Sequence, residues 1–119
     1  MSFQNYIWYK IAESAGEFSF SENGLIEVNV GGKPICLARH DNKLFVCAQK
    51  CPHAGSLLTE GYIDPAGNIV CPKHHYKFSM KNGYNVSGEG FFLKTFPVEA
   101  RADGIYVGIP SGSLFGDPK

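Results

Sequence analysis

The chain has 119 residues, of which 44% are hydrophobic and 18% are charged. This size is typical of one folded domain, and we expect residues 1–119 to form a single domain. Eleven basic side chains balance eleven acidic ones, so the net charge gives no support for binding to nucleic acid or to an anionic membrane. The segment 1–16 lacks the features of a signal peptide, and no apolar run is long enough to span a bilayer. We therefore expect a cytoplasmic protein with reduced thiols.

Along the chain, short segments rich in β-branched and aromatic residues are separated by glycine and proline. Residues 9–18 could hold one helical turn at most, and no segment has a sustained helical period. Asp41 and Asn42 form a turn signal between two apolar segments, which predicts a hairpin. This pattern indicates an all-β protein, an antiparallel sandwich or barrel. The strands are expected at 24–30, 33–40, 43–49, 92–101 and 104–110.

Between the two groups of predicted strands, two short loops each begin with Cys-Pro and contain a histidine. The first has the spacing Cys51-x-His53, and the second, after seventeen intervening residues, has the spacing Cys71-x-x-His74. The prolines fix the backbone φ angle in loops that must turn tightly. We expect the region of about 50–83 to be a small subdomain inserted between the strands.

Two thiolates and two imidazoles are a complete ligand set for Zn²⁺ or for an iron–sulfur cluster. Zinc sites usually have two to four residues between paired cysteines or three to five between paired histidines, so a Cys and a His separated by one residue fit zinc poorly. In a [2Fe–2S] centre with two Cys on one iron and two His on the other, each loop would supply one ligand to each iron. The pattern favours this cluster, with structural zinc as the alternative.

This four-ligand pattern resembles that of the Rieske family, and "CPHAG" and "CPKHHYKF" lie in the positions of its two cluster loops. Residues 93–110 resemble the strand pair that closes the family's basal domain. The resemblance implies a Rieske-type antiparallel β-sandwich or barrel over residues 1–119, with the cluster-binding subdomain inserted at about 50–83. It also implies one [2Fe–2S] cluster per chain. The expected ligands are Cys51 and Cys71 on the buried iron and His53 and His74 on the outer iron.

Four other positions distinguish this chain from the high-potential branch of the family. Ser56 and Lys73 stand where that branch carries two further cysteines, so the cluster-loop disulfide cannot form. Tyr76 and Phe78 stand where it carries a serine and a tyrosine whose hydroxyl groups bond to sulfur. Such bonds stabilise the reduced cluster and raise its potential. We therefore expect a low potential, roughly −150 mV rather than +300 mV.

Three further residues invite a role in the site. Cys36 and Cys47 are expected to face each other across the hairpin centred on Asp41-Asn42. Two small buried thiols are the preferred interpretation, and a disulfide is the alternative. His75 adjoins the predicted ligand His74; we interpret it as a solvated loop residue, with a ligand-like or proton-coupled role as the alternative.

The resemblance implies an electron carrier and not an enzyme. Such a ferredoxin would accept single electrons from a flavin-dependent NAD(P)H reductase and pass them to a terminal oxygenase. The alternatives are the small subunit of an assimilatory nitrite reductase and a structural zinc module. Four lysines near the predicted site suggest a basic docking face, against the simpler interpretation of ordinary exposed loop residues. They are Lys50, Lys73, Lys77 and Lys81.

Overall fold

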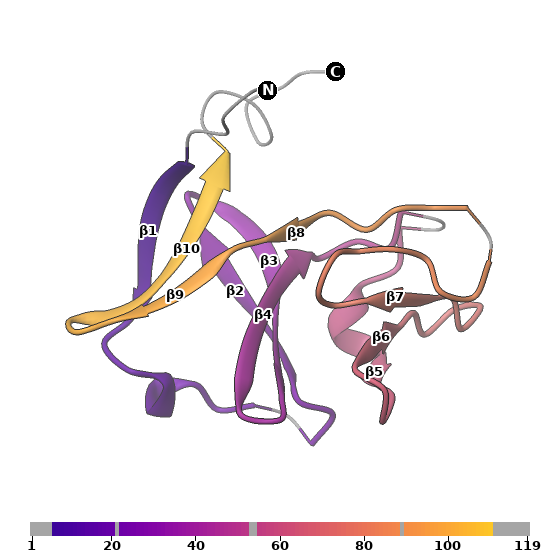
Figure 1. Ribbon diagram of the computed structural model, residues 1–119, viewed down its shortest axis with the longest axis horizontal. Coiled ribbons are helices and arrows are strands. Elements are labelled where there is room, and N and C mark those ends of the chain that lie inside the picture. Colours follow the sequence, from indigo (N-terminus) through magenta and orange to yellow (C-terminus); the bar gives the residue numbers. More distant parts are fainter. Residues whose placement is uncertain (1–5, 21, 53–54, 89, 111–119) are drawn as a thin grey trace.

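The structure is a computed structural model that describes residues 6–20, 22–52, 55–88 and 90–110 (Figure 1). The described residues contain ten strands and two short 3₁₀ turns, and no helix among them is long and apolar enough to cross a membrane. The turns are η1 (Ala15–Glu17) and η2 (Leu58–Glu60). The strands are β1 (Tyr6–Ala12), β2 (Leu25–Val30), β3 (Lys33–His40), β4 (Lys43–Ala48), β5 (Tyr62–Ile63), β6 (Asn68–Val70), β7 (Lys77–Ser79), β8 (Thr95–Phe96), β9 (Val98–Arg101) and β10 (Gly104–Pro110).

The strands form three antiparallel sheets, which confirms the predicted all-β class. Their orders are β1-β10-β9, β2-β3-β4-β8 and β5-β6-β7. Figure 1 shows the β5-β6-β7 sheet at one end of the molecule and the β1-β10-β9 sheet at the other. The chain leaves the middle sheet after Ala48 and returns to it at Thr95, where the Ala48 N–H donates to the carbonyl oxygen of Lys94 at 2.9 Å. The Cys/His region lies within this excursion.

The middle sheet has a buried cluster on each of its faces, because successive side chains of a strand point to opposite sides. From β3, Ile35 and Leu37 share a buried cluster with Val107 of β10. Cys36, between them in sequence, belongs to a second buried cluster that contains Phe78 of β7. The middle sheet thus packs against both outer sheets, and its second face supports the Cys/His region.

The hairpin of β3 and β4 agrees with the sequence-based prediction. Asp41 and Asn42 both have positive φ angles, 53° and 63°. A two-residue hairpin turn needs such angles to match the twist of its strands. With this turn, Cys36 is paired directly with Cys47. The predicted register is therefore confirmed.

The segment 9–18 was expected to hold one helical turn at most, and the structure has one 3₁₀ turn there, η1. Its first residues belong to β1, which was not predicted and which pairs with β10. One prediction near the end of the chain needs correction. The single strand expected over 92–101 is two short strands, β8 in the middle sheet and β9 in the outer sheet. Pro97 lies between them, and because proline has no backbone N–H it cannot continue the ladder.

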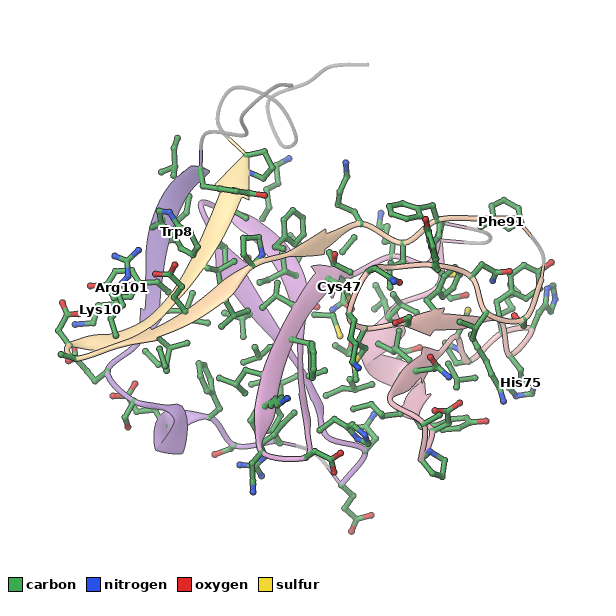
Figure 2. All side chains as sticks on the ribbon, viewed as in Figure 1. Trp8, Lys10, Cys47, His75, Phe91 and Arg101 are labelled. Atoms are coloured by element: carbon green, nitrogen blue, oxygen red, sulfur yellow. The ribbon has the colours of Figure 1, made fainter. Side chains whose placement is uncertain are left out.

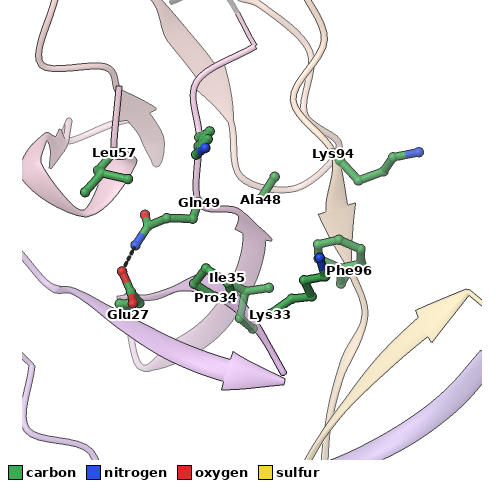
Figure 3. A pocket seen from close by; sticks show the side chains of 10 residues that line it. Glu27, Lys33, Pro34, Ile35, Ala48, Gln49, Leu57, Lys94 and Phe96 are labelled. Carbon is green, nitrogen blue, oxygen red and sulfur yellow. Dashed lines mark hydrogen bonds between the residues drawn. The ribbon is translucent and has the colours of Figure 1, made fainter. Parts of the chain in front are cut away.

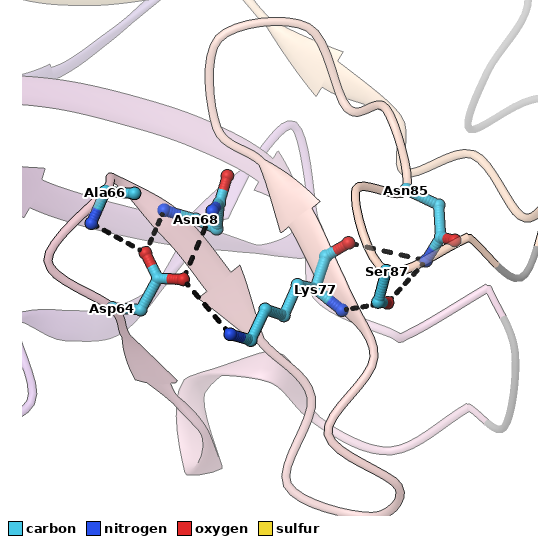
Figure 4. A network of polar contacts seen from close by, with 6 residues as sticks. All are labelled: Asp64, Ala66, Asn68, Lys77, Asn85 and Ser87. Atoms are coloured by element: carbon cyan, nitrogen blue, oxygen red, sulfur yellow. Dashed lines mark hydrogen bonds and ion pairs between the residues drawn. The ribbon is translucent and has the colours of Figure 1, made fainter.

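The turn between β5 and β6 is organised by the carboxylate of Asp64 (Figure 4). It accepts hydrogen bonds from the backbone N–H groups of Ala66 and Asn68 at 3.0 and 2.9 Å, and from the Asn68 side chain at 3.1 Å. Lys77 Nζ lies 3.7 Å from the same group. Burial by itself would raise the pKa of Asp64. The hydrogen bonds to the carboxylate and the charge of Lys77 outweigh this effect, so the pKa is lowered. The carboxylate therefore ties β7 to the β5–β6 turn.

Candidate metal centre

Two of the predicted ligands are buried thiols in the same cluster of side chains. Cys51 is 2% exposed and Cys71 is 0% exposed, and both pack in the cluster that contains Leu58 and Phe78. Cys51 follows the end of β4, and Cys71 follows β6 directly. The fold thus brings together two cysteines that are twenty residues apart in the sequence.

The two cysteine loops share one backbone pattern. The N–H of Cys51 donates to the carbonyl oxygen of Ser56 at 2.8 Å, and the N–H of Gly55 donates back to the Cys51 carbonyl at 2.8 Å. In the second loop the N–H of Cys71 donates to the carbonyl of Tyr76 at 2.9 Å, and the N–H of His75 donates to the Cys71 carbonyl at 3.1 Å. Each cysteine is therefore held by bonds to the residues four and five positions later.

This equivalence assigns a role to His75 that its sequence position did not reveal. Gly55 has a φ angle of 73° and His75 one of 62°, so both occupy the left-handed region at the same point of their loops. Glycine adopts this conformation freely, whereas other residues are strained in it. The His75 side chain is exposed, as expected. Its backbone closes the second loop.

Replacing Gly55 by alanine and replacing His75 by glycine are expected to shift the stability of the protein in opposite directions. Gly55→Ala should lower the free energy of unfolding by about 1–2 kcal/mol. A Cβ there meets no atom of the described residues within 4 Å, apart from its chain neighbours, so the backbone conformation is the expected penalty. His75→Gly should raise it by up to about 1 kcal/mol, because relief of strain exceeds the added chain entropy. Urea denaturation of both variants measures the two shifts. A destabilised His75→Gly variant would show that the imidazole has a role beyond the loop backbone.

The predicted ligand His74 is exposed, whereas the two predicted cysteine ligands are buried. Its ring centroid is 6.4 Å from that of Tyr76, which packs against the cluster that contains Cys51 and Cys71. The fourth predicted ligand, His53, lies outside the described residues. Among the residues that are described, no three candidate ligand side chains are close enough together to hold a metal ion.

These residues fit the donor set of a [2Fe–2S] centre with unequal surroundings for its two irons. Two buried thiols can supply soft anionic ligands in an apolar cluster, and an exposed imidazole can supply a neutral ligand facing solvent. Cys51 and Cys71 would hold the inner iron, and His74, with His53, would hold the outer one. Such a group supplies a site that gains and loses a single electron.

The other two cysteines have different chemistry. None of the four cysteines, all of which are described, is in a disulfide. The pKa of the Cys47 thiol is raised well above its ordinary value, chiefly by a hydrogen bond with Cys36 and secondly by burial. A thiol held protonated is a poor metal ligand, because the thiolate is the ligating form. Their geometry favours the interpretation as two small buried core residues.

Gln49 anchors the first loop, a role that was not predicted from the sequence. Its side chain, 4% exposed, donates from Nε2 to Glu27 Oε1 at 2.7 Å and accepts from the Thr59 N–H at 3.2 Å. Its carbonyl accepts from the Leu58 N–H at 2.7 Å. The sequence did offer one indication of this role: Gln49 is a polar residue at the apolar end of a predicted strand, two residues before Cys51. It joins η2 to β2 beneath the first cysteine loop.

Comparison with protein-family models gives one decisive match. The model described as "Rieske [2Fe-2S] domain" matches residues 7–97, which include all four predicted ligands. The chain belongs to the Rieske [2Fe–2S] domain family. Its cofactor is therefore a Rieske-type [2Fe–2S] cluster, and the structural zinc alternative is not supported.

Among characterised proteins, the Rieske chain is similar to the ferredoxin component of the alkene monooxygenase system of Xanthobacter autotrophicus. The two are 25% identical over 80 residues, which are 67% of this chain and 66% of the relative. It is also similar to a solved complex of reduced oxygenase and oxidized ferredoxin in carbazole 1,9a-dioxygenase, with a TM-score of 0.70 and 28% identity over 87% of this chain and 94% of that one.

The nitrite reductase alternative has a structural relative as well. A putative NADH-dependent nitrite reductase small subunit from Mycobacterium tuberculosis superposes with a TM-score of 0.75, covering 90% of this chain and 98% of that one. At 16% identity, this likeness shows a shared fold alone.

Proposed function

We propose that this Rieske protein is an electron carrier of an oxygenase system, the ferredoxin that takes single electrons from a flavin-dependent NAD(P)H reductase and delivers them to a terminal oxygenase. The observation that supports the proposal is the matched backbone geometry of the two loops, in which Cys51 and Cys71 are buried in one cluster and His74 is exposed. The ferredoxin components among its relatives support this over a catalytic role. Residues 1–119 would act as one Rieske domain, and four cysteines outside any disulfide suit the cytoplasm.

We place the basic docking face suggested by the sequence beside the first cysteine loop. Of its four lysines, Lys73 is exposed on the second loop. Lys77 is paired with Asp64, and Lys81 lines a separate pocket beside His40. Lys50 instead lines a pocket of about 420 Å³ next to the first cysteine loop. Two further lysines, Lys33 and Lys94, line the same pocket, and its apolar wall includes Leu57 and Phe96 (Figure 3).

Charge complementarity defines the partner that this pocket suits. Of its charged lining residues, three are lysines and one is Glu27, whose carboxylate accepts the bond from Gln49. An acidic segment of the terminal oxygenase would be attracted to this face, and such attraction chiefly raises the association rate. As part of the proposal, the oxygenase docks its acidic segment beside the first cysteine loop.

Rapid mixing of the reduced protein with a terminal oxygenase tests both parts. We expect the visible spectrum to report re-oxidation by one electron per chain, with a rate that falls as ionic strength rises. Lys94→Gln should slow the second-order step several-fold at low salt. Lys10→Gln is the control, because Lys10 lies at the end of the molecule far from His75 (Figure 2).

The possible failures of this experiment have distinct meanings. A reduced protein that transfers no electron to any oxygenase tested, but does support a nitrite reductase, would contradict the proposed function. Transfer at a rate indifferent to salt and to Lys94 would leave the carrier role intact and contradict only the docking face.

A further inference from the structure

Two adjacent phenylalanines of the segment after β7 have different partners. The ring centroid of Phe91 lies 5.8 Å from that of Tyr76, and the Tyr76 centroid lies 6.4 Å from that of His74. Phe92 instead packs edge-to-face on Tyr84, with the centroids 5.8 Å apart. One phenylalanine thus begins a row of three rings that ends on a predicted ligand, and its neighbour stands outside that row.

Hydrogen bonds to β7 fix the path of the chain that carries Phe91. The Lys77 N–H donates to Ser87 Oγ at 3.0 Å, and Asn85 Nδ2 donates to the Lys77 carbonyl at 3.4 Å (Figure 4). The Gly90 N–H donates to Asn85 Oδ1 at 3.3 Å. Because β7 begins directly after Tyr76, the loop and the tyrosine are tied to the same strand. The contact between the two rings is therefore built into the local structure.

The burial of these rings indicates what the row does. Phe91 is 38% exposed, whereas Tyr76 beneath it is half-buried and packs against the cluster that holds both cysteine ligands. Phe91 covers Tyr76 from the solvent side and so limits the access of water to the side of His74 on which Tyr76 lies. Apolar cover around a metal site lowers the local dielectric and thereby changes its reduction potential.

We propose that Phe91 is a positioning residue of the redox site. Through Tyr76 it holds the His74 imidazole in place and keeps water from that side of the site, and it thereby lowers the reduction potential. The physical reason is charge. When one electron enters, the site becomes more negative by one unit, and a water-poor surrounding stabilises that extra charge less well than water does. The inference rests on the proposed electron-carrier function and on His74 as a ligand.

Reductive titration of two matched variants tests the proposal at one fixed pH. With dithionite as the electron donor, Phe91→Ala is expected to increase the equilibrium constant for one-electron reduction at least threefold. This corresponds to a midpoint potential roughly 28 mV more positive, at about 59 mV per tenfold change. Phe91→Ala should also alter the electron paramagnetic resonance line shape of the reduced protein. Phe92→Ala, which removes the same ring one position later, should leave both readouts unchanged.

Phe91→Leu serves as the second variant should the alanine variant lose its cluster. It keeps apolar bulk over Tyr76 and should give a shift in the same direction but smaller than that of Phe91→Ala. Equal shifts in the Phe91 and Phe92 variants, or a potential in Phe91→Ala and Phe91→Leu unchanged from wild type, would overturn the proposal. A wild-type protein without a reversible one-electron transition would instead contradict the proposed function.

Discussion

Replacement of Cys71 or Cys51 by alanine is expected to give a colourless protein that retains neither iron nor a reduced-state electron paramagnetic resonance signal. Each substitution removes one of the two buried thiols assigned to the inner iron, and two Cys and two His leave no spare ligand in this donor set. The loss should be complete and not graded. Visible absorption, iron analysis and the resonance spectrum of the dithionite-treated protein measure it.

The other two cysteines supply the control for this experiment. Cys36 and Cys47 are buried in the same cluster, so alanine at either position removes a thiol of the same size from the same core. These variants should lose about 1–2 kcal/mol of stability from the cavity but should keep the cluster. A colourless Cys36→Ala variant that still folds would contradict our assignment of the ligands.

Gly83→Ala is expected to unfold the outer part of the Cys/His region. A Cβ at Gly83 would collide with the carbonyl oxygen of Leu93, and the residue has a φ angle of 81°, which alanine adopts only with strain. Backbone strain and overpacking together should cost between about 2 and 5 kcal/mol. Gly83 also donates its N–H to Ser79 and accepts from Leu93, so the collision occurs where two segments are joined.

Gly88→Ala is the control that separates backbone strain from the collision with Leu93. Gly88 has a φ angle of 90°, close to that of Gly83, but a Cβ there meets no atom of the described residues within 4 Å, apart from its chain neighbours. Its substitution should therefore cost only the backbone strain, about 1–2 kcal/mol. The difference between the variants in denaturant unfolding, and in amide exchange over residues 79–93, isolates the collision. Equal losses of stability in the two variants would contradict the prediction, because the backbone around Leu93 would then move aside at little cost in free energy.

Local patterns of the sequence were sufficient to predict the hairpin and the two loops. Asp41 and Asn42 tolerate positive φ angles, so the turn and the pairing of Cys36 with Cys47 follow from neighbouring residues alone. The Cys-Pro pairs similarly predicted two related loops. The ligand assignment itself stays a prediction, with Cys51 and Cys71 together in one buried cluster and His53 outside the described residues.

Long-range contacts decided what the sequence did not reveal. The strand β1 is stabilised by β10, almost a hundred residues later, and its mixture of aromatic, basic and apolar residues gave no clear alternation by itself. The role of His75 appeared only when its loop was compared with that of Gly55. The row from Phe91 through Tyr76 to His74 depends on how Asn85 ties its loop to β7.

The sequence by itself determined the chemistry of this Rieske protein, because ligand type and spacing are properties of short segments that each loop carries independently. Residue types at Tyr76 and Phe78 likewise carry the prediction of a low potential, which the midpoint measurement will check. Only the tertiary structure decided which side chains surround the site: which lysines gather beside the first loop, and which phenylalanine covers Tyr76. Those neighbours come from distant parts of the chain, and their positions depend on the packing of three sheets and not on any local pattern.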